Sequence, residues 1–153
     1  MKLGDVLRKE RERKKLSLAD TATRLGLPEE KYAEIEAGTS PVETWGPLLF
    51  QSAVKLETPT SRLLAESGKS KDCKPGQAGE LIRKHRERKQ LTTEQLAQQL
   101  GIPREELEQI EAGSSPIEEY GPILLGFAEV IEQPVFNLYL PHGIQYDKLD
   151  DYP

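Results

Sequence analysis

The sequence predicts an all-α protein built from two copies of one small helical unit. Residues 91–113 have the apolar spacing, caps and breakers of two short helices. The same pattern occurs 75 residues earlier, which indicates an internal duplication. The composition agrees, because 36% of the residues are hydrophobic and 31% are charged. Two units of about 65 residues lie near the lower limit for independent folding, so each core has to be compact and helical.

The first of the two short helices has a clear beginning and end. Thr92 is a good N-cap residue, and Gln95 follows three residues later as in a capping box, so the helix should start at Thr93. Gly101 should stop it, since glycine readily takes the left-handed conformation that ends helices.

The second helix should follow after a tight turn. Pro103 is suited to the first helical position, where its missing N–H has no cost, and Gly113 can close the helix. The small Ala97 should let the two helices approach closely. The predicted inner faces contain Leu96, Ala97, Leu100, Leu107 and Ile110.

Residues 16–38 repeat this pattern in the first half of the chain. The two halves align without a gap from Gly4 and Gly79 through Pro59 and Pro134. Identical positions include the pairs Leu16/Leu91, Ala22/Ala97, Leu25/Leu100, Gly26/Gly101, Pro28/Pro103 and Ile35/Ile110, and both copies end this pattern with Glu-Ala-Gly.

The other helices surround this pair in each repeat. A cationic first helix is predicted over residues 3–15 and 79–89, with interleaved glutamates that favour a solvated face. A proline inside a helix costs about 3 kcal/mol. We therefore expect a turn at residues 42–45 and a fourth helix that starts at Pro47 and reaches about residue 56. Residues 59–64 should form a short fifth helix.

The predicted domain organisation has four parts. Residues 1–66 form the first domain, residues 67–77 a polar linker, residues 78–141 the second domain and residues 142–153 an acidic-aromatic tail. The linker contains Gly68, Pro75 and Gly76, so we expect it to be flexible and the two domains to be mobile. The tail either packs on its own domain or docks onto a partner or onto the first repeat.

Composition also restricts the function. The net charge is −5, and residues 76–153 carry 14 acidic against 7 basic side chains, so any nucleic-acid surface must be local. One cysteine and two histidines are too few for a metal centre, and no cofactor is expected. No apolar run approaches the roughly 20 residues that span a bilayer, so we expect a cytoplasmic protein without membrane contact. No catalytic motif indicates an enzyme.

Taken together, the helix order, the LTTEQLAQQLGI run and the IEAG ending resemble the Cro/C1-type (XRE) helix-turn-helix family over about 60 residues of each half. The resemblance implies two tandem five-helix, lambda-repressor-like domains. It also implies that an arginine on the first helix pairs with the glutamate that ends the third. These structural ion pairs are Arg11 with Glu36 and Arg86 with Glu111.

In this family the third helix is laid in the DNA major groove. The resemblance places Lys31 in the first repeat, and Thr93, Arg104, Glu105 and Gln109 in the second, as candidate DNA-binding residues. Both third helices are rich in glutamate, however, and a carboxylate can only accept from base amino groups. Leu18 takes the place of the phosphate-binding donor in the first repeat, so that repeat is expected not to read DNA by this face.

Two functions remain open from the sequence. The first is a DNA-binding transcriptional regulator, in which the tandem domains imitate a homodimer on one operator; the whole chain could also form a homodimer. The alternative is a protein-protein interaction adaptor that contacts a protein partner through its acidic third helices or its C-terminal tail. The resemblance favours the first function and the local charge favours the second.

Overall fold

The computed structural model describes residues 2–139, and every regular element in that range is helical. This confirms the predicted all-α fold with tandem domains. The tail at residues 142–153 lies outside the described residues. No helix within residues 2–139 combines the length and the apolar character needed to cross a bilayer. The elements are α1 (Leu3–Arg13), α2 (Leu18–Leu25), α3 (Glu29–Ala37), α4 (Val42–Leu56), the 3-10 helices η1 (Thr60–Leu63) and η2 (Ser70–Asp72), α5 (Gln77–Arg88), α6 (Thr93–Leu100), α7 (Arg104–Glu111), α8 (Ile117–Ile131) and the 3-10 helix η3 (Val135–Leu138).

The helix-turn-helix pairs, α2–α3 and α6–α7, follow the predicted pattern closely. Helix α6 begins at Thr93, and the side chain of Thr92 accepts a hydrogen bond from Gln95 N at 3.0 Å. Gly101 ends α6 with a φ of 71°. Helix α7 starts one residue later than predicted, with Pro103 as its N-cap rather than its first residue. The predicted inner faces are buried or packed against the core.

The prediction that the fourth helix starts at Pro47 is wrong. Helix α4 is continuous from Val42 and contains Pro47, and α8 contains Pro122 in the same place. Gly46 lacks the Cβ that would clash with the proline ring, which lowers the cost of the proline. The start of α4 is fixed because Val42 N donates to the buried Ser40 hydroxyl at 3.1 Å. Buried residues along the whole helix, such as Leu49, then outweigh the lost backbone hydrogen bond.

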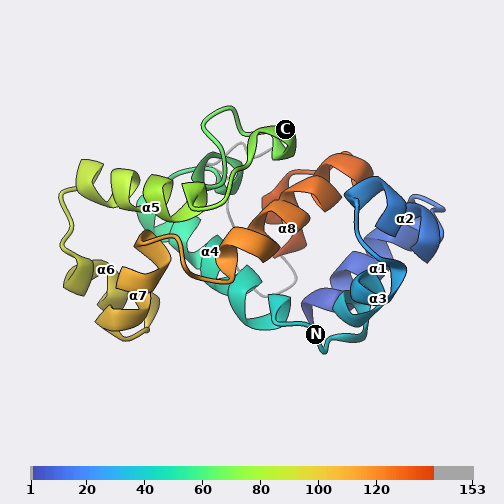
Figure 1. Cartoon of the computed structure of the whole chain (residues 1–153), viewed down its shortest axis with the longest axis horizontal. Helices are drawn as coiled ribbons and strands as arrows, with labels where there is room; N and C mark the ends of the chain where they lie inside the picture. The colour runs from blue at the N-terminus through green and yellow to red at the C-terminus, as the bar shows by residue number, and fades with distance from the viewer. Residues whose placement is uncertain (1, 140–153) are drawn as a thin grey trace.

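Each fourth helix begins on its own repeat and then packs against the other one. Helix α4 packs against α6, α8 packs against α2, and the two fourth helices pack against each other. Figure 1 shows α1, α2 and α3 at one end of the molecule and α5, α6 and α7 at the other, with α4 and α8 crossing between them. The 3-10 helices that come after them also contact the other repeat, since η1 contacts α5 and η3 contacts α1. The two repeats have thus exchanged their C-terminal parts.

The exchange buries aromatic side chains that come from different repeats. The rings of Tyr32 and Phe127 stack at a centroid distance of 6.4 Å, and those of Phe50 and Tyr139 lie 5.1 Å apart. Tyr32, Phe50 and Phe127 are at most 1% exposed. Aromatic side chains of this size dominate the energetics of a core, so the largest buried groups hold the two halves together.

Equivalent ion pairs at the ends of the fourth helices show that the exchange is nearly symmetric. Lys14 Nζ lies 3.7 Å from Glu132 Oε2, and Lys89 Nζ lies 3.0 Å from Glu57 Oε2. The two pairs are related by the same offset of 75 residues as the sequence repeat. Each connects the end of one first helix to the end of the other repeat's fourth helix.

The expectation of a flexible linker between mobile domains is wrong for the described residues. Residues 70–72 form η2, which packs against α8. Ser70 N donates to the Glu129 carboxylate at 2.9 Å, and the Ser70 hydroxyl donates to the other oxygen of the same carboxylate. Composition predicted a loop, but the exchange places α8 beside it. The sequence boundaries of the two domains stay a prediction.

Candidate nucleic-acid interface

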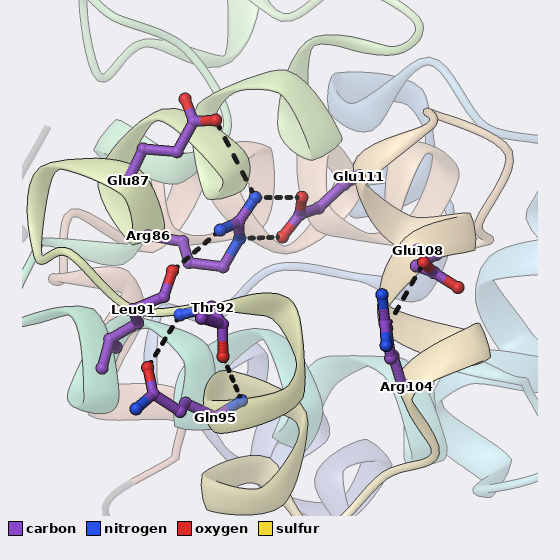
Figure 2. A network of polar contacts seen from close by, with 8 residues as sticks. All are labelled: Arg86, Glu87, Leu91, Thr92, Gln95, Arg104, Glu108 and Glu111. Carbon is purple, nitrogen blue, oxygen red and sulfur yellow. Dashed lines mark hydrogen bonds and ion pairs between the residues drawn. The ribbon is translucent and has the colours of Figure 1, made fainter.

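Arg86 fixes the second helix-turn-helix pair to α5. Its Nε lies 2.7 Å from Glu111 Oε2, its Nη2 donates to Glu111 Oε1 at 3.0 Å, and its Nη1 donates to the Leu91 carbonyl at 2.8 Å (Figure 2). The side chains of Arg86 and Glu111 are 11% and 7% exposed. The pair therefore joins α5, the segment before α6 and the end of α7, and so sets the orientation of α7.

The first repeat contains the same arrangement. Arg11 Nε lies 2.6 Å from Glu36 Oε2, and Arg11 Nη1 donates to the Leu16 carbonyl at 2.8 Å. The hydrogen bond that Arg11 donates to Glu36 raises the pKa of Arg11 against the opposing effect of burial, and the hydrogen bond to Glu111 does the same for Arg86. Burial, followed by the neighbouring Glu36 carboxylate, raises the pKa of Tyr32. These charges therefore hold the fold together rather than offering a site to a ligand.

The start of α6 is formed by a capping box. Thr92 N donates to Gln95 Oε1 at 2.9 Å, and Gln95 N donates to Thr92 Oγ1 at 3.0 Å (Figure 2). Thr93 is the first helical residue and is partly exposed. The positive end of the helix dipole lies here, and helix N-termini of this kind bind phosphate groups. Leu18, the equivalent residue of α2, is packed against the core instead.

Helix α7 presents Arg104, Glu105 and Gln109 to solvent. Arg104 Nε lies 3.5 Å from Glu108 Oε2, and the two side chains are 56% and 51% exposed (Figure 2). A pair this exposed contributes little stability, so Arg104 can exchange Glu108 for another acceptor at small cost. The predicted candidates of the second repeat thus lie on α7 and at the start of α6, the two helices of one motif.

The outer face of α6 carries further donors that lie outside the predicted site. Gln98 and Gln99 are exposed, and a glutamine amide can donate to phosphate and to base edges alike. Their helical spacing from the buried Leu96 and Ala97 predicts that they face solvent.

The first repeat uses its candidate cation elsewhere. Lys31 forms an ion pair with Glu119 of α8, and its Nζ lies 5.7 Å from the centre of the Tyr120 ring. The hydrogen bond to Glu119 raises the pKa of Lys31 against the effect of burial. The exchange of helices creates this contact, since Glu119 belongs to the other repeat. Lys31 therefore has a partner on α8, in a contact at the surface, while Glu29, Glu30 and Glu34 are exposed on α3.

The comparison with known families agrees with this geometry. A family model described as a helix-turn-helix domain matches residues 2–48 and 77–120, more than half of the chain. The chain belongs to this helix-turn-helix family. No curated protein and no solved structure matches it. The two matched segments end within α4 and α8. The rest of each fourth helix, which packs against the other repeat, lies outside the match.

Proposed function

We propose that this helix-turn-helix protein is a DNA-binding transcriptional regulator that contacts DNA through α6 and α7. The observation that carries this proposal is the difference between the two third helices. On α7, Arg104 and Gln109 are exposed and bound only weakly or not at all to other side chains in the described part of the chain. On α3, the cation Lys31 is held by Glu119.

In this proposal the residues have separate roles. Thr93 and the N-terminus of α6 receive a backbone phosphate, which positions the motif without reading sequence. Arg104 and Gln109 read base edges in the major groove, and Glu105 accepts from a cytosine or adenine amino group. The acidic α3 stays away from the duplex, because its three exposed glutamates repel phosphate.

The test is selection of duplexes from a random DNA pool by the full chain, followed by binding titrations at several salt concentrations. We expect a selected sequence whose affinity falls steeply with salt. Arg104→Ala should lower selectivity by about 5- to 150-fold, the range that one bidentate base contact provides. Glu29→Ala is the matched control at the equivalent position of the first repeat and should leave selectivity unchanged. The absence of any retarded duplex at low salt would contradict the proposal.

One observation favours a second function, a protein-protein interaction adaptor. Because Lys31 is engaged, the exposed charges at the start and middle of α3 are all negative. Such a surface fits a basic protein partner. The triple variant Glu29→Lys, Glu30→Lys and Glu34→Lys should then lose a partner that wild-type protein retains from nuclease-treated cell extract. A partner lost equally in Arg104→Ala would not fit this function.

A further inference from the structure

A cleft of about 350 Å³ lies where the end of α4 and η1, from the first repeat, meet α5 of the second. Its charged and ionisable walls are Glu57, Arg62 and Glu66 from the first repeat and Lys84, His85 and Arg88 from the second. Glu57 is paired with Lys89. Neither repeat could form this cleft alone, because the exchange of helices brings its two walls together. It lies on a different face of α5 from Arg86, which contacts α7.

The basic groups of the cleft are positioned but only loosely neutralised. Arg88 Nη2 donates to the hydroxyl of Thr58 at 2.9 Å, and this hydroxyl is buried and donates in turn to the Leu56 carbonyl. Lys84 Nζ lies 3.3 Å from Glu66 Oε1, and the two side chains are 65% and 70% exposed. An ion pair this exposed to water is weak, so a multiply charged anion can replace Glu66 as the partner of Lys84.

The duplication supplies an internal comparison. The equivalent seam at the other end of the molecule has Asn137 where the cleft has Arg62, and Glu10 where it has His85. Glu10 there pairs with Arg13, the equivalent of Arg88, at 3.1 Å. The two seams are built from equivalent helices with equivalent apolar residues, but their charged residues differ. Packing alone therefore does not require the basic groups, since the other seam is built without two of them.

We propose that this cleft binds a small ligand that carries phosphate groups. Arg62 and Arg88, one from each repeat, offer planar sets of N–H donors, which suit the oxygens of a phosphate. One donor of Arg62, Nη1, is bonded to the Glu66 carbonyl, and Lys84 adds a mobile charge. His85 also lines the cleft, with its Nδ1 3.5 Å from the Thr58 hydroxyl. Because the walls belong to different repeats, the bound ligand stabilises the seam between them. The inference does not depend on DNA binding.

The experiment is a titration of the full chain with inorganic pyrophosphate at constant ionic strength, followed by proton NMR of the imidazole signals. The chain has two histidines, His85 and His142, so the His85 signal is assigned by comparison with His85→Gln. Burial, Arg88 and Lys84 lower the pKa of His85 in the free protein. Bound anion should shift its signal saturably and raise its pKa, because the negative charge favours the imidazolium.

Matched variants separate this site from general charge effects. Arg62→Ala and Lys84→Ala should each weaken pyrophosphate binding by about tenfold, the scale of one charge-assisted hydrogen bond. Lys9→Ala, at the position equivalent to Lys84, should change it by less than about twofold. Circular dichroism checks that each variant is folded. An unsaturable shift, an equal loss in Lys9→Ala, or displacement of pyrophosphate by a nonspecific DNA duplex would each overturn the assignment, the last because the phosphate would then come from nucleic acid.

Discussion

Gly4 and Gly79 allow the first and third helices of each repeat to touch. A Cβ at Gly4 would lie 2.2 Å from the Ile35 carbonyl oxygen, and one at Gly79 would lie 1.9 Å from that of Ile110. Real Cβ atoms do not approach backbone this closely. Glycine is thus required here by space rather than by dihedral angle, and the alignment of the two glycines reflects the same helix crossing in both repeats.

We predict that Gly79→Ala destabilises the protein by about 1–3 kcal/mol, the usual cost of overpacking a rigid contact. Gly126→Ala is the control, because its Cβ would meet the flexible end of Leu25 at 3.3 Å. In the control, alanine should also stabilise the helix relative to glycine, by up to about 1 kcal/mol. Urea unfolding, monitored by circular dichroism, measures the stability of both variants. A Gly79→Ala midpoint equal to that of wild type would contradict the close approach.

The buried ion pair of Arg86 and Glu111 leads to a second prediction at this scale. Arg86→Met alone should cost about 3–5 kcal/mol, because it leaves Glu111 buried without its partner. The double variant with Glu111→Leu should recover a large part of that loss, since it removes the stranded charge. A double-mutant cycle by chemical unfolding gives the coupling. Additive losses in the double variant would show that the two groups act independently.

At the scale of the elements, α4 and α8 show how tertiary packing overrides a local rule. Each contains a proline after a glycine and still runs for 15 residues. Their first turns are also held from outside, because the carboxylate of Glu43 accepts from Leu3 N and Gly4 N at 2.9 Å. Glu118 does the same for Ala78 N and Gly79 N. One carboxylate thus caps the first helix and anchors the fourth.

The packing of α5 against the end of α4 should depend on pH through His85. The folded-state pKa of His85 is lowered, mainly by burial and then by Arg88 and Lys84, with the Thr58 hydroxyl also facing the ring. A depressed pKa means that the stabilisation is present above the unfolded pKa of about 6.5 and is lost as the pH falls below it.

The measurement is the free energy of unfolding of wild type minus that of His85→Gln. We expect this difference to decrease as the pH falls from about 7.5 to about 5.5, the range in which an ordinary histidine gains its proton. Subtraction removes the contribution of the carboxylates, which are the same in both proteins. A difference that stays constant or increases toward acid pH would contradict the direction of the shift.

Local features were predictable because their causes are local. The cap at Thr92, the stop at Gly101 and the apolar faces of α6 and α7 depend on residues a few positions apart. The exchange of helices was not predictable in the same way. Both repeats carry the same apolar pattern, so Leu49 would be buried equally well against either partner. The pattern specifies that a face is covered, but in a duplicated chain it does not specify by which copy.

The candidate site shows the same division. Arg104 and Gln109 are exposed at the positions that the resemblance gave them. The contact of Lys31 with Glu119 could not be found from sequence, because the two residues are 88 positions apart and meet only through the exchange. The basic cleft was missed for the same reason, since Arg62 and Lys84 come from different repeats.

At the scale of the whole molecule, the exchange makes the two repeats one folding unit. Aromatic stacking, two equivalent ion pairs and the packed linker all cross the seam. A disturbance in one repeat must therefore reach the other. It also follows that α3 and α7 keep a fixed relation, at opposite ends of the molecule.

The most direct test uses the single tryptophan, Trp45, which lies on α4 and is partly buried. Its fluorescence is followed during urea unfolding of wild type and of Gly79→Ala, whose substitution lies in the second repeat, alongside circular dichroism. If the repeats have exchanged helices, the Trp45 midpoint falls together with the circular dichroism midpoint in one cooperative transition. If Trp45 instead unfolds at the wild-type urea concentration while part of the dichroism signal shifts, the repeats are independent and the account is contradicted.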